Sequence, residues 1–204
     1  DSYETETTAT RTVTSVQTSI NQTLSTSANS TSTIESTSTR TGNRTNGDFT
    51  EDTAREVSAS STGASTNQTQ SGSSESAEAL TEVFRQIGND ITGLYSITST
   101  TTSSMSEDLS EINTDRNITG SSASAATVSR TVNGNSVTGD YSDSSESTSE
   151  VTRNQSGDIG DRSFTLAEST LTASVSNSSG NEITTAETSN SSNSETFEYT
   201  KDTT

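Results

Sequence analysis

Four residue types that carry much of protein chemistry are missing from this chain of 204 residues: histidine, cysteine, proline and tryptophan. Without histidine or cysteine the chain lacks the usual general base, the usual thiolate nucleophile, any disulfide, and the usual ligands of zinc, haem and iron–sulfur clusters. No serine or threonine therefore has a histidine to activate it as a nucleophile. We expect that the protein is not an enzyme and that it holds no cofactor.

Basic residues are also scarce, since ten Lys and Arg stand against 28 Asp and Glu and give a net charge of -18. A nucleic-acid partner is not expected, because phosphate binding requires a basic face. No run of about 20 apolar residues is present, which excludes a membrane-spanning helix. The sequence begins at Asp1 without the charged and apolar regions of a signal peptide, which predicts that such a peptide was removed or lies upstream.

Apolar residues make up only 23% of the chain, whereas serine and threonine together number 87. Low hydrophobicity with high net charge is typical of disordered chains. The chain contains 33 Val, Ile, Leu, Met, Phe and Tyr residues. Burying all of them in a hydrophobic core within the one chain would not offset the loss of conformational entropy of the whole backbone. An ordered chain of this composition needs backbone ladders shared with neighbouring copies, stacked repeats or attached carbohydrate, which points to an assembly.

The sequence repeats with a period of 46 residues, a spacing typical of repeat architectures. Gly-Asn pairs recur at this interval, and a second glycine and an aromatic residue follow, as in G-N-S-V-T-G-D-Y-S from Gly134 to Ser142. Asp1 stands where the first copy should have this second glycine, and Thr185 and Glu187 replace the glycine and the aromatic residue in the last copy. The residues that define the repeat are Gly42, Asn43, Gly88, Asn89, Gly134, Asn135, Gly180, Asn181, Tyr3, Phe49, Tyr95 and Tyr141.

Two further columns share the period, and both are largely apolar. One contains Val13, Ala59, Met105 and Val151, and the other contains Ile91, Val137 and Ile183 with Thr45 in the first copy. A weaker half-period of 23 residues connects Gly134-Asn135 to Gly157-Asp158. The predicted repeats are 1–46, 47–92, 93–138 and 139–184, followed by a partial repeat 185–204, as in a segment of a longer array.

The residues between the Gly-Asn pairs favour β-structure. Threonine is β-branched and suits a pleated surface, glycine permits tight turns, and the absence of proline favours uninterrupted ladders. We predict an all-β fold in which tandem repeats of about 46 residues, made of short strands and Gly-Asn turns, form an extended fibre, either a solenoid or stacked β units. Each column aromatic and the Ile or Val three to four residues before it should form a thin apolar seam.

The segment 76–87 has the opposite local pattern, because Leu80, Val83, Phe84 and Ile87 have helical spacing. The aligned segments 30–41 and 122–133 are too rich in serine and threonine to form helices. Since a shared period implies a shared backbone, we predict a strand here as well.

Carbohydrate attachment is indicated mainly by the serine and threonine content, because such stretches carry O-glycans. Eight asparagines also occupy N-x-[ST] sequons, although many sequons arise by chance in a chain so rich in hydroxyl residues. These glycosylation candidates are Asn21, Asn29, Asn43, Asn67, Asn117, Asn154, Asn177 and Asn190.

A weak calcium motif is present in S-G-D-I-G-D, where Asp158 and Asp161 are the candidate ligands. Calcium-binding nonapeptide repeats also combine glycine and aspartate, but they occur in tandem and this motif stands alone. An ordinary solvated turn is the alternative.

The repeat from Gly134 to Ser142 and the stretch from Asn154 to Leu166 are similar to Thr/Ser/Gly-rich repeats of giant secreted bacterial surface proteins, of the planctomycete type with RHS-associated regions. The resemblance implies an extracellular, repetitive and glycosylated structural element, and it transfers no functional residue to this chain.

We therefore expect a structural subunit of an extracellular or cell-surface fibril, whose partners are copies of itself or adjoining repeats of the same chain. Three alternatives remain open. The first is an adhesin whose repeats bind a ligand, the second is a stalk made rigid by calcium, and the third is a disordered linker.

Overall fold

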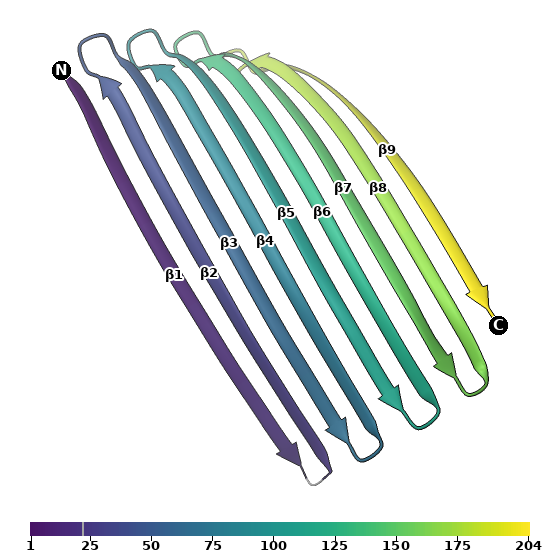
Figure 1. Cartoon of the computed structure of the whole chain (residues 1–204). Coiled ribbons are helices and arrows are strands. Elements are labelled where there is room, and N and C mark those ends of the chain that lie inside the picture. Colours follow the sequence, from purple (N-terminus) through teal and green to yellow (C-terminus); the bar gives the residue numbers. More distant parts are fainter. Residues whose placement is uncertain (22) are drawn as a thin grey trace.

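The computed structural model of the chain describes residues 1–21 and 23–204, which form one open antiparallel sheet of nine strands (Figure 1). Each strand pairs with the next one along the chain, so the sheet is a simple meander. The predicted all-β fold is confirmed, and segment 76–87 is a strand as predicted. The strands are β1 (Ser2–Asn21), β2 (Leu24–Asn43), β3 (Asp48–Asn67), β4 (Gln70–Asn89), β5 (Leu94–Asn113), β6 (Arg116–Asn135), β7 (Asp140–Ile159), β8 (Arg162–Asn181) and β9 (Ala186–Thr203).

The strands are much longer than the sequence suggested. Strands β1 to β8 each contain 20 residues and β9 contains 18, so a repeat holds two long strands instead of several short ones. The connections alternate between two residues at one end of the sheet and four at the other, which accounts for the period of 46. Successive strands thus begin 22 or 24 residues apart, and this alternation explains the weak half-period of 23.

The pairing register advances by 46 residues for every two strands, without a slip. Tyr3 pairs with Gly42, and Gly42 in turn pairs with Phe49, which lies 46 residues after Tyr3. The same advance holds for each later pairing. Residues at equivalent positions of all strands therefore stand in straight lateral rows that cross the sheet at right angles to the strands.

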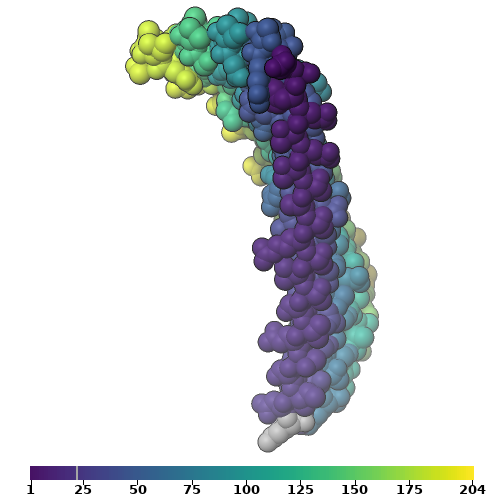
Figure 2. Space-filling model, turned by 90° about the vertical axis from the view of Figure 1, so that its left-hand side faces the viewer, coloured from purple at the N-terminus to yellow at the C-terminus, as the bar shows by residue number. Residues whose placement is uncertain are grey.

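The sheet is a single layer and has no interior. Figure 2 shows it nearly edge-on, bent most strongly toward the end that carries the four-residue turns. Ile118, which is 4% exposed, is the only buried side chain apart from glycines in the part of the chain that the structure describes. The predicted solenoid or stacked units are thus replaced by one open sheet, in which backbone hydrogen bonds between strands provide most of the order.

The four-residue turns are built by the Gly-Asn repeat. In three of them the glycine that ends the turn donates its N–H to the carbonyl of the asparagine four residues earlier, at 2.8–2.9 Å. These glycines, Gly47, Gly93 and Gly139, have φ of 79°, 74° and 78°, a region that favours glycine. The asparagine side chain completes the turn, since Asn89 Oδ1 accepts the N–H groups of Ile91 and Thr92 at 2.9 and 2.8 Å.

Neighbouring turns also bind one another. The N–H of Asp90 donates to the carbonyl of Gly47 at 2.8 Å, and the next two pairs of turns repeat this bond. Ile91 packs directly on Gly47, where a Cβ atom would lie 2.7 Å from Ile91 Cγ1. The predicted seam of aromatic residues with the preceding Ile or Val is therefore split into two separate sets of contacts. The Ile and Val side chains pack between neighbouring turns, whereas the aromatic rings lie on the sheet. In the first copy Asp1 takes the place of the glycine and its carbonyl accepts the N–H of Arg44 at 2.9 Å.

The last turn departs from the consensus and yields a test. Thr185 occupies the glycine position with φ of 57°, which is unfavourable for a β-branched residue. We expect Thr185→Gly to raise the free energy of unfolding by about 0.5–1 kcal/mol, because it removes a left-handed strain of about 1–2 kcal/mol at some entropic cost. The measurement is thermal unfolding followed by circular dichroism. The neighbouring Thr184→Gly is the control and should lower stability, and a stabilisation by both changes would contradict the explanation.

Candidate functional surfaces

The two faces of the sheet differ sharply in composition. We define the aromatic face as the odd-numbered residues of β1, β3, β5, β7 and β9 together with the even-numbered residues of the other strands, which the register places on one side. It carries all eight aromatic residues and 22 of the 30 large apolar residues in strands. The opposite side, the threonine face, carries 26 of the 34 threonines in strands.

Charge is divided just as unequally. The aromatic face has eight basic and nine acidic residues, a net charge of -1. The threonine face has one basic residue, Arg85, and 14 acidic residues, a net charge of -13. Two carboxylate pairs even stand directly opposite each other across strands, Glu35 with Glu56 and Glu75 with Asp108. Such like-charge pairs are unfavourable, so the threonine face repels anions and other copies of itself.

Aromatic and glycine residues alternate along one lateral row of the aromatic face. Each ring leans over the glycine of the following strand, so that a Cβ atom at Gly42 would lie 2.6 Å from Tyr3 Oη and one at Gly88 would lie 2.6 Å from Phe49 Cζ. This arrangement covers strand glycines with aromatic rings, a known way of fixing strand register. The row comprises Tyr3, Gly42, Phe49, Gly88, Tyr95, Gly134, Tyr141 and Gly180.

Ion pairs neutralise much of the aromatic face internally. Arg55 Nη1 lies 2.8 Å from Glu82 Oε2 on the paired strand. Arg130 binds both carboxylate oxygens of Asp143, and these hydrogen bonds lower the pKa of Asp143 below its usual 3.8. The Arg40 guanidinium lies 4.6 Å from the centre of the Phe49 ring, a cation–π contact. Five of the eight basic residues of this face are therefore engaged with carboxylates of the sheet.

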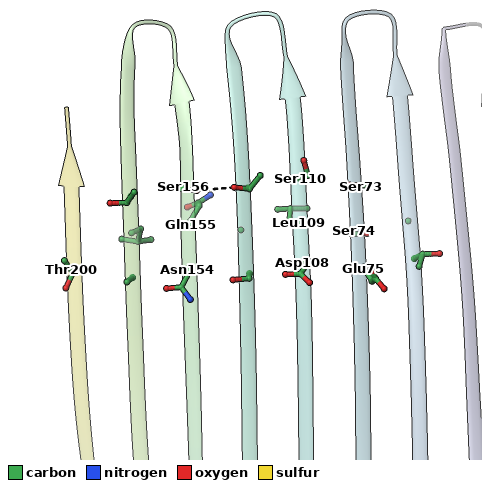
Figure 3. Close-up of a pocket in the computed structure, with 18 residues that line it drawn as sticks. Ser73, Ser74, Glu75, Asp108, Leu109, Ser110, Asn154, Gln155, Ser156 and Thr200 are labelled. Atoms are coloured by element: carbon green, nitrogen blue, oxygen red, sulfur yellow. Dashed lines mark hydrogen bonds between the residues drawn. The ribbon is translucent and has the colours of Figure 1, made fainter.

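The threonine face is hollowed between its lateral rows. One hollow is an open trough of about 830 Å³ that crosses the strands from β3 to β9 (Figure 3). Its walls are formed by short polar side chains of two rows, including Thr119 and Ser156, whose hydroxyls are 3.1 Å apart. Glu75 and Asp108 contribute carboxylates to the same trough. The trough offers hydroxyl and carboxylate oxygens for hydrogen bonding to a polar ligand.

The calcium candidates lie near the end with the two-residue turns. Asp158 is on the threonine face of β7, with Asn117 and Ser163 as its cross-strand partners, and Asp161 lies in the turn that follows. Among residues 1–21 and 23–204 no group of three or more acidic side chains is placed to hold a metal ion.

The predicted glycosylation residues lie mainly on the threonine face, which carries six of the eight. Asn177 and Asn190 stand opposite each other there, whereas Asn21 and Asn67 end strands on the aromatic face. All eight are exposed except Asn43, which is half-buried and whose Oδ1 accepts the N–H of Thr45 at 2.9 Å.

The repeat-defining residues are the one predicted set that the structure brings together, since all of them lie at the end of the sheet with the four-residue turns. Sequence reasoning missed the division into two faces. The signal was present in the odd or even numbering of the aromatic residues, but it becomes visible only once the register of the long strands is known.

Comparison with other proteins finds no matching family model, no matching curated protein and no matching solved structure. In the described part of the chain no helix is long and apolar enough to cross a lipid bilayer.

The alternating row yields a matched pair of glycine variants. Gly88→Ala should lower the free energy of unfolding by about 1–3 kcal/mol, because the new Cβ meets the Phe49 ring at 2.6 Å. Gly120→Ala is the control on the same face, since its Cβ would meet nothing closer than 3.5 Å. This control should be neutral or stabilising by about 0.4–1 kcal/mol. Chemical denaturation measures both, and equal effects would mean that the rings do not fix the row.

Proposed function

We propose that this chain is a structural element of an extracellular fibre in which the sheet extends laterally, through adjoining repeats or further copies. The observation that carries the proposal is the uninterrupted 46-residue advance of the register in a sheet without a core. A sheet held by backbone ladders gains stability with each strand added, because the ordering cost of an edge is shared over more strands.

The two outer strands support lateral growth. On their outer sides β1 and β9 present rows of N–H and C=O groups without a partner strand in the described sheet. Protective features of natural edges, such as proline or closely spaced lysines, are absent from both strands. Edges of this kind are templates for another strand.

Strand direction limits how copies can join. β1 and β9 run in the same direction (Figure 1). A junction of β9 with β1 of a second copy in the same orientation would therefore be parallel. If the aromatic faces stay on the same side, antiparallel junctions, the type found throughout this sheet, require β9 against β9 or β1 against β1.

An adhesin is the second candidate function, because all aromatic residues lie on one face. Of the eight aromatic residues, only Phe197 and Tyr199 are exposed, at 57% and 55%, and both lie on β9. The other six are half-buried, and four of those cover the row of glycines described above. This use of the rings in the sheet favours the structural function.

Carbohydrate is included in the proposal, and the threonine face is its expected location. That face carries most of the threonines and six of the eight sequon asparagines, and glycans there would remain solvated beside a net charge of -13. The resemblance to glycosylated bacterial surface repeats points in the same direction.

Ribbon formation is the first expected outcome. At a low ionic strength of about 10 mM the charges of neighbouring copies repel, whereas at about 150 mM the screening length falls to about 8 Å. Electron microscopy should then show ribbons, and diffraction should give a strand spacing of about 4.8 Å. A compact monomer under all these conditions would exclude the fibre function.

A pair of proline variants tests whether the edge is responsible. Ser191 and Ser192 lie at the middle of β9, and successive N–H groups of a strand point to opposite sides. One of Ser191→Pro and Ser192→Pro removes a donor from the open edge, and the other breaks a bond to β8. The variant whose proline faces the open edge should keep the unfolding temperature of the parent protein, because its bonds to β8 are intact. This variant should nevertheless fail to form long ribbons.

Peptide mapping of the native material by mass spectrometry tests the carbohydrate. We expect modified residues on the threonine face and few on the aromatic face. A map without modified Ser, Thr or Asn would remove the glycan from the proposal.

A further inference from the structure

The aromatic face is an extended surface without a partner in the described chain. Of the large apolar side chains it carries, Val128 is 41% exposed, Met105 is 45% and Leu109 is 47%. A strand of 20 residues with a rise of about 3.4 Å per residue is about 68 Å long, and nine strands about 4.8 Å apart span about 43 Å. Each face of the sheet therefore has an area of about 2,900 Å². A stable interface needs only about 800 Å² from each partner, so less than a third of the face would suffice.

The two middle lateral rows of this face carry seven of its 22 large apolar side chains. Ile34, Val57 and Leu80 are consecutive members of one lateral row. The row continues through Ser103 to Ala126, so that it crosses five strands with a single polar interruption. A largely apolar row at the middle of a sheet is a feature of the inner faces of β-sandwiches.

We propose that the aromatic face packs against the aromatic face of a second copy, giving a two-layered sheet with the threonine faces outside. The inference deepens the proposed structural function by naming the partner of this face, and it rests on that function. A second copy fits because it presents a surface of equal size, matching composition and near-zero net charge.

Electrostatics selects this pairing among the three that two sheets can form. When two aromatic faces meet, each brings a net charge of only -1, and the arginine–carboxylate pairs remain formed within each sheet. A mixed pairing would bring -1 against -13, and two threonine faces would meet with -13 against -13. Because both outer faces of the two-layered sheet then carry -13, a third sheet would have to pack on a strongly acidic face, which opposes a third layer.

Two adjacent serines of β5 provide a matched test. Ser103 lies on the aromatic face between Leu80 and Ala126, and Ser104 lies on the threonine face between Ala79 and Ala125. Because the chain contains no cysteine, Ser103→Cys and Ser104→Cys each introduce a unique thiol. For each variant, the rate of reaction of the thiol with a water-soluble maleimide is measured over a series of protein concentrations, from dilute monomer to assembled protein. We expect S103C to become at least tenfold less reactive on assembly and S104C to keep its rate.

A second pair of variants measures the association itself. Ser103→Glu places a charge in the interface, and Ser104→Glu adds the same charge to the outer face. Sedimentation should show that S103E weakens association at least tenfold, whereas S104E changes it less than threefold.

The outcomes separate this inference from the fibre function. Ribbons in which both thiols react equally would overturn the two-layered sheet and leave the fibre intact. Protected S103C in discrete pairs without ribbons would support the face contact and contradict the fibre. Protection of S104C, protection of S103C only after a polysaccharide is added, or no protection of either thiol at any concentration would overturn the proposal.

Discussion

The whole structure depends on the lateral hydrogen-bond ladder between strands of equal length. In the described part of the chain nearly every side chain is exposed or half-buried, which leaves backbone pairing as the interaction that extends throughout the sheet. Such a ladder requires every strand to begin and end at the same rows. The two alternating turn lengths meet this requirement, because they return each strand to the register of the one two positions before it.

The side chains add specificity to a ladder that backbone chemistry alone would leave free to slip. Strands rich in serine and threonine look alike in several registers, and a slip by one residue would exchange the two faces. The rings over glycines and the turn asparagines penalise such slips at one end of the sheet. At the other end, among the described residues, no aromatic ring is nearest to the Cβ position of a glycine, and cross-strand pairs such as Thr119 with Ser156 offer only weak discrimination.

The sequence alone predicted the period, the β-structure and the turns at one end, because the Gly-Asn pair and the later glycine recur in a clear pattern. The left-handed residue is the later glycine, four residues after the asparagine, and not the glycine of the Gly-Asn pair. It did not predict the turns at the other end. Gln68-Thr69 and Thr114-Asp115 contain no glycine, although Gln68 has φ of 47°. Strand length was hidden for a related reason, since hydroxyl residues occur on both faces and the hydrophobic alternation that marks a strand is diluted. The sidedness of Leu80 and Phe84 against Val83 and Ile87 follows only from the strand assignment of β4.

The constant advance of the register has a consequence for how such a gene can change. Removing or duplicating any 46-residue unit leaves all surrounding pairings in place, because the strands on either side of the junction meet with unchanged alignment. Unequal recombination between copies would therefore alter only the width of the sheet, by about 9.6 Å per unit. Homologous genes could differ widely in copy number while encoding the same architecture, and the number of copies would set the dimension of the particle.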